Sequence, residues 1–175
     1  MGTFNTLISS EEIESKLAEM GAQISADYRG KDLLVVGVLK GAFMVMADLA
    51  RNITIPVEFD FMAVSSYGAS TQTSGVVRIL KDLDQEIADR HVLIVEDIID
   101  SGLTLNYLMK SLKVRKPASI EIAALLVKQG IQRVPIEVRY AAFNIGPEFV
   151  IGYGLDYAGK YRNLPYVAVV EGSLD

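Results

Sequence analysis

The chain has 175 residues, of which 50% are hydrophobic and 22% charged, and this balance predicts one globular domain over residues 1–175 with a sizeable core. A net charge of −5 without a basic block argues against nucleic acid as a partner. The absence of cysteine excludes disulfides and thiolate catalysis, and the single histidine excludes a histidine metal cluster.

No apolar run in the sequence approaches the roughly 20 residues that a membrane-spanning helix needs. The beginning of the chain, MGTFNTLISSEE, also lacks the basic region and apolar core of a signal peptide. We therefore expect a cytoplasmic protein that does not bind membranes.

The first predicted element is a helix that begins after Ser9. Ser9 and Glu12 have the spacing of a capping box. Apolar residues then recur at helical spacing from Ile13 to Tyr28, and Gly30 ends the run.

The next elements alternate between strands and helices. LLVVGVL, residues 33–39, predicts a strand buried on both faces, and Gly41 opens a helix that ends near Arg51. Residues 66–75, SYGASTQTSG, are small and polar, and Tyr67 has no core to join there, so this segment is a candidate lid. The other predicted strands are residues 57–65, 76–80, 91–97, 119–127, 138–145, 149–154 and 166–171, and the other predicted helix is 103–115.

Buried strands that alternate with helices predict an α/β fold with a mostly parallel central sheet flanked by helices. In such sheets, ligands bind at the carboxyl ends of the strands. Two of these ends, VLKG after the strand 33–39 and EDIIDSGLT after the strand 91–97, combine a glycine with the start of a helix. Backbone amides and the helix dipole bind phosphate groups at such places. Lys40 lies at the first of these ends and is therefore a candidate contact.

The second strand end carries three acidic residues in the segment VLIVEDIIDSGLTL. Glu96 and Asp97 directly follow four apolar residues, Val92 to Val95, and Asp100 comes after two more. Buried charge without a partner is strongly disfavoured, so a ligand is expected to compensate it. Glu96 and Asp97 would repel a phosphate, but they suit the hydroxyl groups of a ribose or Mg²⁺.

The residues that follow these acids suit a terminal phosphate. Gly102 permits a tight turn, and Ser101 and Thr104 offer hydroxyl donors at the start of a helix. A ribose 5-phosphate therefore fits both halves of the segment, with its hydroxyls on the acids and its phosphate in the turn.

Three other residues have plainer interpretations from the pattern alone. Lys128 closes an apolar run, which usually marks the exit of a strand to water. Phe149 and Tyr153 lie in a predicted strand and are expected in the core.

VLIVEDIIDSGLTL resembles the signature of type I phosphoribosyltransferases, which bind 5-phosphoribosyl 1-pyrophosphate (PRPP). Four further segments are similar, in order and spacing, to the hypoxanthine-guanine phosphoribosyltransferase family, and the resemblance covers residues 34 to 170. These segments are VGVLKGAFMVMADL (36–49), SSYG (65–68), LLVK (125–128) and FVIGYGLDYAGKYRNLPY (149–166).

This resemblance implies the type I phosphoribosyltransferase fold with a small hood region. It also implies purine salvage, in which Mg²⁺-dependent transfer from PRPP to hypoxanthine or guanine gives IMP or GMP and pyrophosphate. The assembly that it suggests is a homodimer or homotetramer.

The resemblance implies roles for individual residues on the side of the purine base. Asp100 would be the general base or acid near N7. Lys128 would contact O6, Phe149 would stack on the base, and Val150 would offer its backbone.

On the side of PRPP, the resemblance places Glu96 and Asp97 at the ribose hydroxyls and in the metal shell. Asp156 would help to hold a second Mg²⁺, and Arg162 would touch pyrophosphate. The other implied contacts are Ser101, Gly102, Leu103 and Thr104 around the 5′-phosphate, Leu39, Lys40 and Gly41 at pyrophosphate in a loop that often has a non-proline cis peptide, and Ser66 and Tyr67 in the lid.

Two alternatives stay open, and the sequence also departs from the family in small ways. A PRPP-sensing regulator that binds RNA would need a basic face, and within enzymes the same reaction on xanthine is the nearest alternative. Residues 129–133, QGIQR, replace a more basic stretch, and residues 146–148, GPE, replace a common turn.

Overall fold

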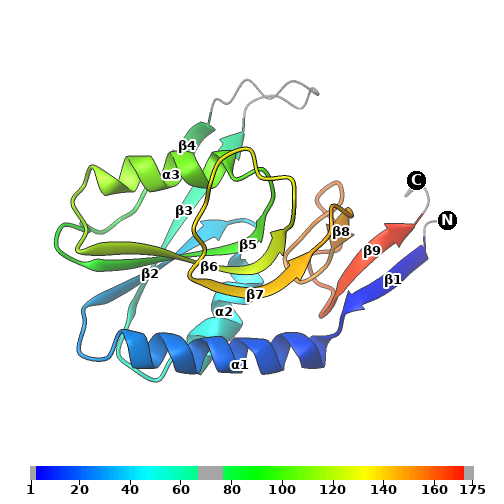
Figure 1. The fold of residues 1–175 in the computed structure, drawn as a ribbon, viewed down its shortest axis with the longest axis horizontal. Helices are drawn as coiled ribbons and strands as arrows, with labels where there is room; N and C mark the ends of the chain where they lie inside the picture. The colour runs from blue at the N-terminus through cyan, green and yellow to red at the C-terminus, as the bar shows by residue number, and fades with distance from the viewer. Residues whose placement is uncertain (1–2, 67–76, 172–175) are drawn as a thin grey trace.

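The computed structural model describes residues 3–66 and 77–171 and shows an α/β arrangement (Figure 1). Most of the expected lid, including Tyr67, lies outside the described residues. The elements are β1 (Thr3–Ile8), α1 (Ser10–Asp27), β2 (Leu33–Leu39), α2 (Phe43–Asn52), β3 (Glu58–Ser66), β4 (Val77–Lys81), β5 (His91–Ile99), α3 (Leu103–Lys113), β6 (Ser119–Lys128), β7 (Tyr140–Ile145), β8 (Val150–Ile151) and β9 (Val167–Glu171).

The central sheet has the strand order β4-β3-β2-β5-β6-β7. All neighbours pair in parallel except β4, which pairs antiparallel with β3. From β2 the chain passes through α2 to β3 on one side, and from β5 it passes through α3 to β6 on the other. The strand order therefore reverses between β2 and β5, and their carboxyl ends form the place where open α/β sheets bind ligands.

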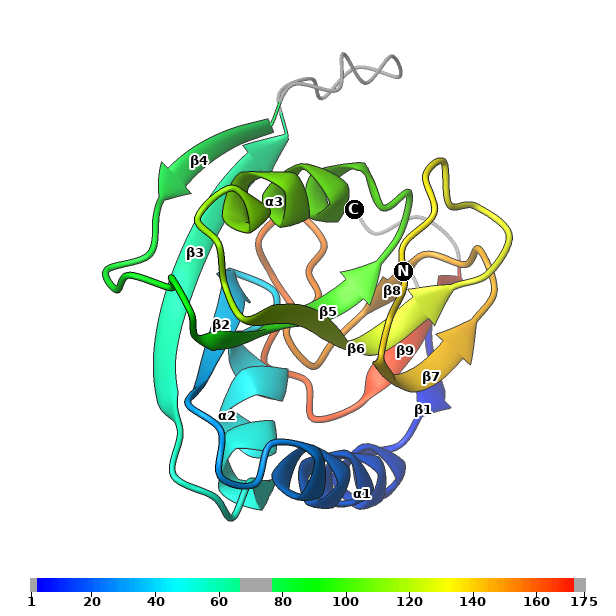
Figure 2. The same ribbon diagram turned by 60° about the vertical axis from the view of Figure 1, so that its left-hand side comes forward.

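Helices cover both faces of this sheet, with α1 and α2 on one face and α3 on the other (Figure 2). Alternate residues of β2 separate between the two hydrophobic clusters. Leu33 and Val35 pack with residues of α1 and α2, whereas Leu34 and Val36 pack with residues of α3. The prediction of a strand buried on both faces is confirmed, as expected for a parallel sheet between helices.

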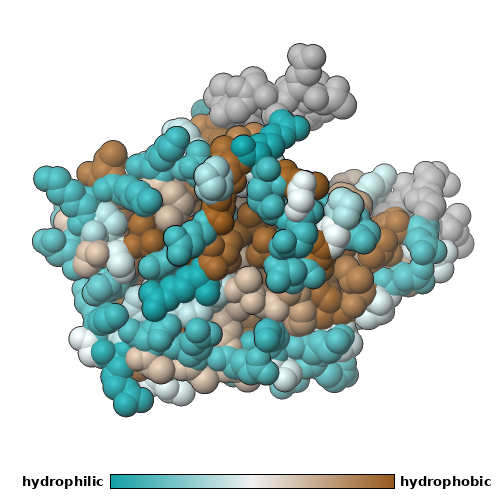
Figure 3. Space-filling model, in the orientation of Figure 1, coloured by the Kyte–Doolittle hydropathy of each residue, from teal (hydrophilic) through white to brown (hydrophobic). Residues whose placement is uncertain are grey.

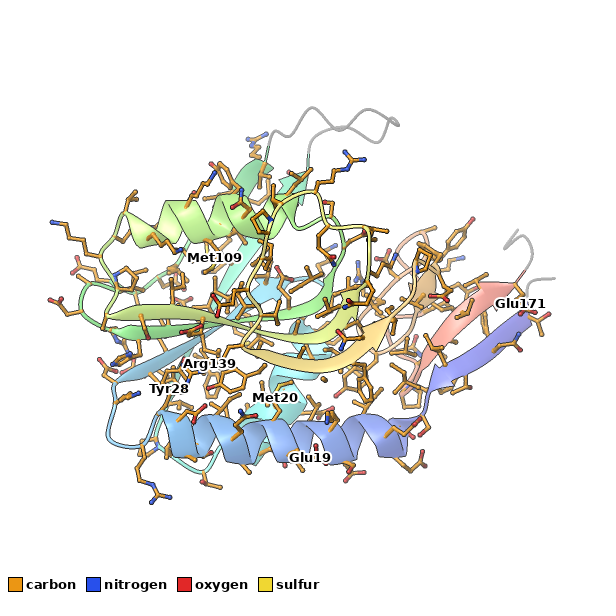
Figure 4. All side chains as sticks on the ribbon, in the orientation of Figure 1. Glu19, Met20, Tyr28, Met109, Arg139 and Glu171 are labelled. Carbon is orange, nitrogen blue, oxygen red and sulfur yellow. The ribbon has the colours of Figure 1, made fainter. Side chains whose placement is uncertain are left out.

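The capping box of α1 is confirmed. The Ser9 hydroxyl accepts a hydrogen bond from the Glu12 amide at 3.2 Å, and the Glu12 carboxylate accepts one from the Ser9 amide at 2.8 Å. Met20 points from α1 toward the sheet and is buried, whereas Glu19 lies on the outer side (Figure 4). The helix ends at Asp27 with Tyr28 as its C-cap, and Gly30, with a φ of 75°, lies in the turn that follows.

A second sheet, with the order β1-β9-β8, joins the two ends of the described chain beside the central sheet (Figure 1). The sequence analysis missed β1, because most of its side chains are exposed and its partner β9 is distant in sequence. The predicted strand 149–154 was too long, since only Val150 and Ile151 pair with β9. Gly152 and Gly154, with φ of 93° and 98°, turn the chain away.

One strand boundary changes the description of the acidic residues. The prediction that β5 ends at Asp97 was wrong, because pairing with β6 continues through Ile99 opposite Val127. Glu96 and Asp97 therefore lie inside the strand and not after it.

None of the helices within the described residues is long and apolar enough to cross a membrane.

The capping box gives a stability prediction. Ser9→Ala removes the acceptor for the Glu12 amide, and loss of such a cap costs about 1 kcal/mol. We expect urea denaturation to show a free energy of unfolding lower by about that amount. Ser10→Ala is the matched control, because the Ser10 hydroxyl donates its hydrogen bond to the exposed carboxylate of Glu11 and does not cap the helix. Equal loss in the two variants would contradict the assignment of the cap.

Candidate active site

A cavity of about 200 Å³ opens at the carboxyl ends of β2 and β5, where the strand order reverses. Its lining brings together several residues that the sequence analysis places around PRPP, with Asp100 from the side of the purine base. Those residues are Leu39, Gly41, Glu96, Asp97, Asp100, Ser101, Gly102 and Thr104, and the other lining residues are Val38, Val64, Ile98, Ile99 and Leu105.

Two adjacent carboxylates form the acidic side of the cavity. Glu96 is 8% exposed, and burial, followed by the nearby charge of Asp97, raises its pKa well above the usual range. Burial also raises the pKa of Asp97, while hydrogen bonds from backbone amides and the positive charge of Arg162 partly oppose the shift. A ligand with hydroxyl donors or positive charge would therefore stabilise both carboxylates in the ionised form.

Contacts with backbone atoms of two other residues fix the position of the Asp97 carboxylate. One carboxylate oxygen accepts a hydrogen bond from the Ile98 amide at 2.8 Å, and the other lies against the Cα of Gly41, where a side chain would overlap it. The peptide between Leu39 and Lys40 is cis, as the family resemblance implies. Position 41 must therefore be glycine while the loop 39–41 and Asp97 keep this contact.

The turn that follows β5 presents backbone amides to the cavity. Gly102 takes a φ of 80°, which glycine adopts without steric cost, and α3 begins at the next residue without a side-chain cap. The Ser101 hydroxyl accepts only a long hydrogen bond, 3.4 Å, from the Leu103 amide. The helix N-terminus and the hydroxyls of Ser101 and Thr104 can therefore bind an anion.

The position of Lys128 differs from that of most lysines at the end of a strand, and the pattern of the sequence alone had left this residue unassigned. It is buried, and its side chain is 10% exposed. Its ammonium lies 3.5 Å from the Asp100 carboxylate, which is itself 60% exposed. The extended pairing of β5 with β6 brings these two strand ends together, so an amine donor and a carboxylate lie side by side at the rim of the cavity.

Asp156 and Arg162 approach the acidic side of the cavity from the segment that follows β8. They form an ion pair at 2.7 Å, and both affect the pKa of Asp97 through their charges. The sequence analysis did not single out Gly154, although its Cα packs against the carbonyl of Gly41. The pair of glycines in GYG could have identified it, because paired glycines often mark backbone that takes a positive φ. Both glycines do so here.

Other predicted residues do not line this cavity. Lys40 is exposed beside it, Leu103 begins α3, and Ser66 ends β3. Val150 is buried in the core, whereas Phe149 is 52% exposed and meets Tyr157 edge to face with ring centroids 6.0 Å apart. The expectation of a core position is therefore wrong for Phe149.

Tyr153 is buried, as expected of a core residue. Its hydroxyl donates a hydrogen bond to the Asp48 carboxylate of α2. This contact ties the segment after β8 to the helix that follows the loop 39–41.

The oxygen donors of the cavity fit Mg²⁺ in one particular way. Within residues 3–66 and 77–171, no three acidic, histidine or cysteine side chains converge as a ready metal cage. Mg²⁺ commonly binds through one or two carboxylates together with water and substrate phosphates. Glu96 and Asp97 both line the cavity, and their carboxylates would supply such ligands if a phosphorylated substrate supplied the others.

Comparisons with known proteins agree with this geometry. Residues 6–158 match the phosphoribosyl transferase domain family. Hypoxanthine-guanine phosphoribosyltransferases of Mycobacterium tuberculosis and Bacillus subtilis are each 50% identical to this chain, over 95% and 94% of it and over 86% and 92% of their own lengths. A crystal structure of a hypoxanthine phosphoribosyltransferase from Staphylococcus aureus superposes with a TM-score of 0.93 at 44% identity, over 95% of this chain and 91% of that one. The chain therefore belongs to the phosphoribosyltransferase family, and within it to the hypoxanthine-guanine phosphoribosyltransferases.

Proposed function

We propose that this protein is a purine-salvage enzyme that transfers the 5-phosphoribosyl group from PRPP to hypoxanthine or guanine with Mg²⁺, giving IMP or GMP and pyrophosphate. The observation that carries the proposal is the pairing, in one cavity, of a phosphate-type turn with two buried carboxylates. Relatives that are 50% identical and named for this reaction support it.

PRPP would lie across the carboxyl ends of β5 and β2. The amides and hydroxyls of residues 101–104, Leu103 included, would hold its 5′-phosphate. Glu96 and Asp97 would accept hydrogen bonds from the ribose hydroxyls, and the loop of Leu39, Lys40 and Gly41 would contact the pyrophosphate together with Arg162. Ser66 and Tyr67 would belong to a lid that excludes water from the activated sugar.

Glu96, Asp97 and Asp156 would supply the protein's carboxylates to Mg²⁺. When it is bound, the metal neutralises charge on the departing pyrophosphate oxygens. The ion pair with Asp156 would keep the guanidinium of Arg162 close to the same oxygens.

The purine would occupy the rim, where Lys128 and Asp100 meet. Its N9 forms the bond to C1′ while the bond from C1′ to pyrophosphate breaks, and Asp100 would take the proton that the base loses at N7. Lys128 would donate to the carbonyl oxygen at position 6. Phe149, with half of its surface exposed, would stack on the ring, and the backbone of Val150 would contact the edge of the base.

The proposal includes a cytoplasmic location and a homodimer or homotetramer. PRPP and the product nucleotides carry several charges and cross membranes poorly, so the enzyme is best placed where they are used. Phe43, Phe59 and Phe61 are partly exposed on the face that carries α2, and a subunit interface would cover such side chains.

The direct test is a PRPP-dependent assay with hypoxanthine, guanine, xanthine, adenine and uracil, with pyrophosphate release as the readout. Conversion of hypoxanthine and guanine is expected. Xanthine as the preferred base would replace the proposed substrates, and release of no pyrophosphate with any 6-oxopurine would overturn the proposal.

Asp100→Asn tests the proton acceptor. The substitution keeps the shape of the side chain but removes its basic charge, and loss of general acid-base catalysis typically slows turnover by about 10² to 10⁴. We expect kcat to fall in that range while the affinity for PRPP, measured by calorimetry, stays close to that of the wild type. A normal kcat would exclude Asp100 as the base.

Lys128→Ala tests base recognition. A charged lysine can only donate, so it matches the 6-oxo group of hypoxanthine and guanine but not the amino group of adenine. Sites built on such a hydrogen bond reject the mismatched analogue by roughly 10⁴ to 10⁵. We expect the wild type to use adenine negligibly. The variant should lose most of its activity on hypoxanthine and guanine, so that their kcat/KM comes closer to that for adenine. The exposed Lys110→Ala is the control.

Glu96→Gln tests the destabilising effect of the buried acid. Because the pKa of Glu96 is higher in the folded state, the folded protein loses stability as pH rises from the unfolded pKa toward the folded pKa. We expect the variant to have a higher free energy of unfolding than the wild type at pH 7, with the difference disappearing near pH 4.

The same variant should gain less thermal stability from PRPP with Mg²⁺ than the wild type does, because one proposed ligand is lost. Glu137→Gln, at an exposed position, is the matched control and should show neither effect. Equal pH dependence in the wild type and Glu96→Gln would exclude the proposed destabilisation.

A further inference from the structure

The segment 129–139 connects β6 to β7 and is the yellow loop of Figure 1. It contacts the turn that follows β5. The amide of Arg133 donates a hydrogen bond to the Ser101 carbonyl at 2.9 Å. A Cβ at position 102 would lie 2.9 Å from the Ile136 side chain and 3.4 Å from that of Val134, so the loop rests closely on Gly102.

The same loop contacts the proposed base-reading lysine. The side-chain amide of Gln132 donates a hydrogen bond to the backbone carbonyl of Lys128, the last residue of β6. The next amide, that of Gln129, bonds to the Ile145 carbonyl of β7 at 2.9 Å. The neighbouring Gln129 side chain points elsewhere, to Asn144 at 2.8 Å. Gln132 is therefore the side chain of this loop that holds the carbonyl of Lys128.

Packing holds only part of the loop: Ile136 and Val138 lie against the buried cluster that includes Ile99 and Leu105. A cavity of about 370 Å³ lies beneath it, with walls that include Val127, Val134 and Ile136. Figure 3 shows apolar side chains in the middle of the face that the loop crosses. Beside this space, the hydrogen bond from Gln132 adds to the strand pairing of Lys128 with Ile145 in holding the end of β6.

Gln132 can hold its hydrogen bond to Lys128 at a small entropic cost, because the backbone of the next residue, Arg133, is bonded to Ser101. The Gln132 side chain is exposed, and a long exposed side chain normally keeps its rotamer freedom. The bond from Arg133 to Ser101 fixes the backbone one residue away, so less freedom is lost when the Gln132 amide bonds to Lys128. The buried ammonium of Lys128 is confined beside Asp100, so a shift of its backbone displaces the donor.

We propose that Gln132 is a positioning residue for base recognition, because it holds the backbone of Lys128 and thereby sets where the ammonium meets the purine. This inference rests on the proposed function. Gln132 would not touch the substrate, and its effect would reach the base through Lys128 alone.

The experiment compares the wild type with Gln132→Ala, Gln132→Glu and the control Gln129→Ala. Gln132→Glu keeps the shape of the side chain but replaces the N–H donor by a carboxylate facing a carbonyl. One lost hydrogen bond corresponds to about a threefold to tenfold change in an equilibrium. We expect KM for hypoxanthine to rise by that factor in Gln132→Ala and by at least as much in Gln132→Glu.

Three measurements separate positioning from a general structural role. KM for PRPP should stay within about twofold of the wild type in both Gln132 variants, and Gln129→Ala should keep the wild-type KM for hypoxanthine. Urea denaturation should show a loss of stability no greater than the roughly threefold to tenfold change in the folding equilibrium that one hydrogen bond accounts for. A wild-type KM for hypoxanthine in Gln132→Glu would overturn the proposal, as would an equal rise in KM for PRPP. A wild type that converts neither hypoxanthine nor guanine would instead overturn the proposed function.

Discussion

The contact between the Asp97 carboxylate and the backbone of Gly41 determines how the pieces around the cavity fit together. Asp97 belongs to β5, and Gly41 follows β2, so the contact joins the two strands between which the sheet order reverses. The carbonyl of Gly41 also contacts Gly154, which belongs to the segment after β8. A side chain at position 41 or 154 would overlap its neighbour, so two glycines allow three distant parts of the chain to meet.

This arrangement also explains how a carboxylate can lie inside an apolar strand. Glu96 and Asp97 interrupt a run of fully buried residues, and desolvation makes their charged forms unfavourable. Asp97 gains a backbone hydrogen bond and the nearby charge of Arg162, whereas among residues 3–66 and 77–171 no side chain donates a hydrogen bond to Glu96. The folded chain thus retains an unfavourable charge at the place where a ligand can compensate it, which is typical of functional sites.

Local patterns in the sequence predicted much of the fold. The capping box of Ser9 and Glu12 and the apolar run of residues 33–39 depend on neighbouring residues, and both were identified correctly. Strand β1 could not be identified in this way, since it exists through pairing with β9 at the other end of the chain. The end of β5 was misplaced for a related reason, because pairing with β6 extends it past residues whose charge suggests a loop.

The site shows the same division between local and distant information. The turn of residues 101–104 and the acids before it share one segment, so their chemistry was readable from the sequence alone. The local pattern did not identify Lys128, which only the family resemblance had named, because its burial and its contact with Asp100 arise where two strands end side by side. For Phe149 the pattern predicted burial, but the side chain is half exposed. A position in an apolar run does not reveal which residues the sheet leaves uncovered.

The two halves of the proposed site differ in what holds them. Backbone geometry shapes the PRPP half, through Gly41, Gly102 and the strand ends, and such positions tolerate few substitutions. Side chains on a loop above a cavity support the base half, and this loop includes the stretch 129–133 where the sequence departs from the family pattern. A change in the loop can therefore alter base recognition while the phosphate turn and the acidic pair remain in place. On this view, selectivity among purines is adjusted at the weakly packed side of the site, and the transfer chemistry stays on the rigid side.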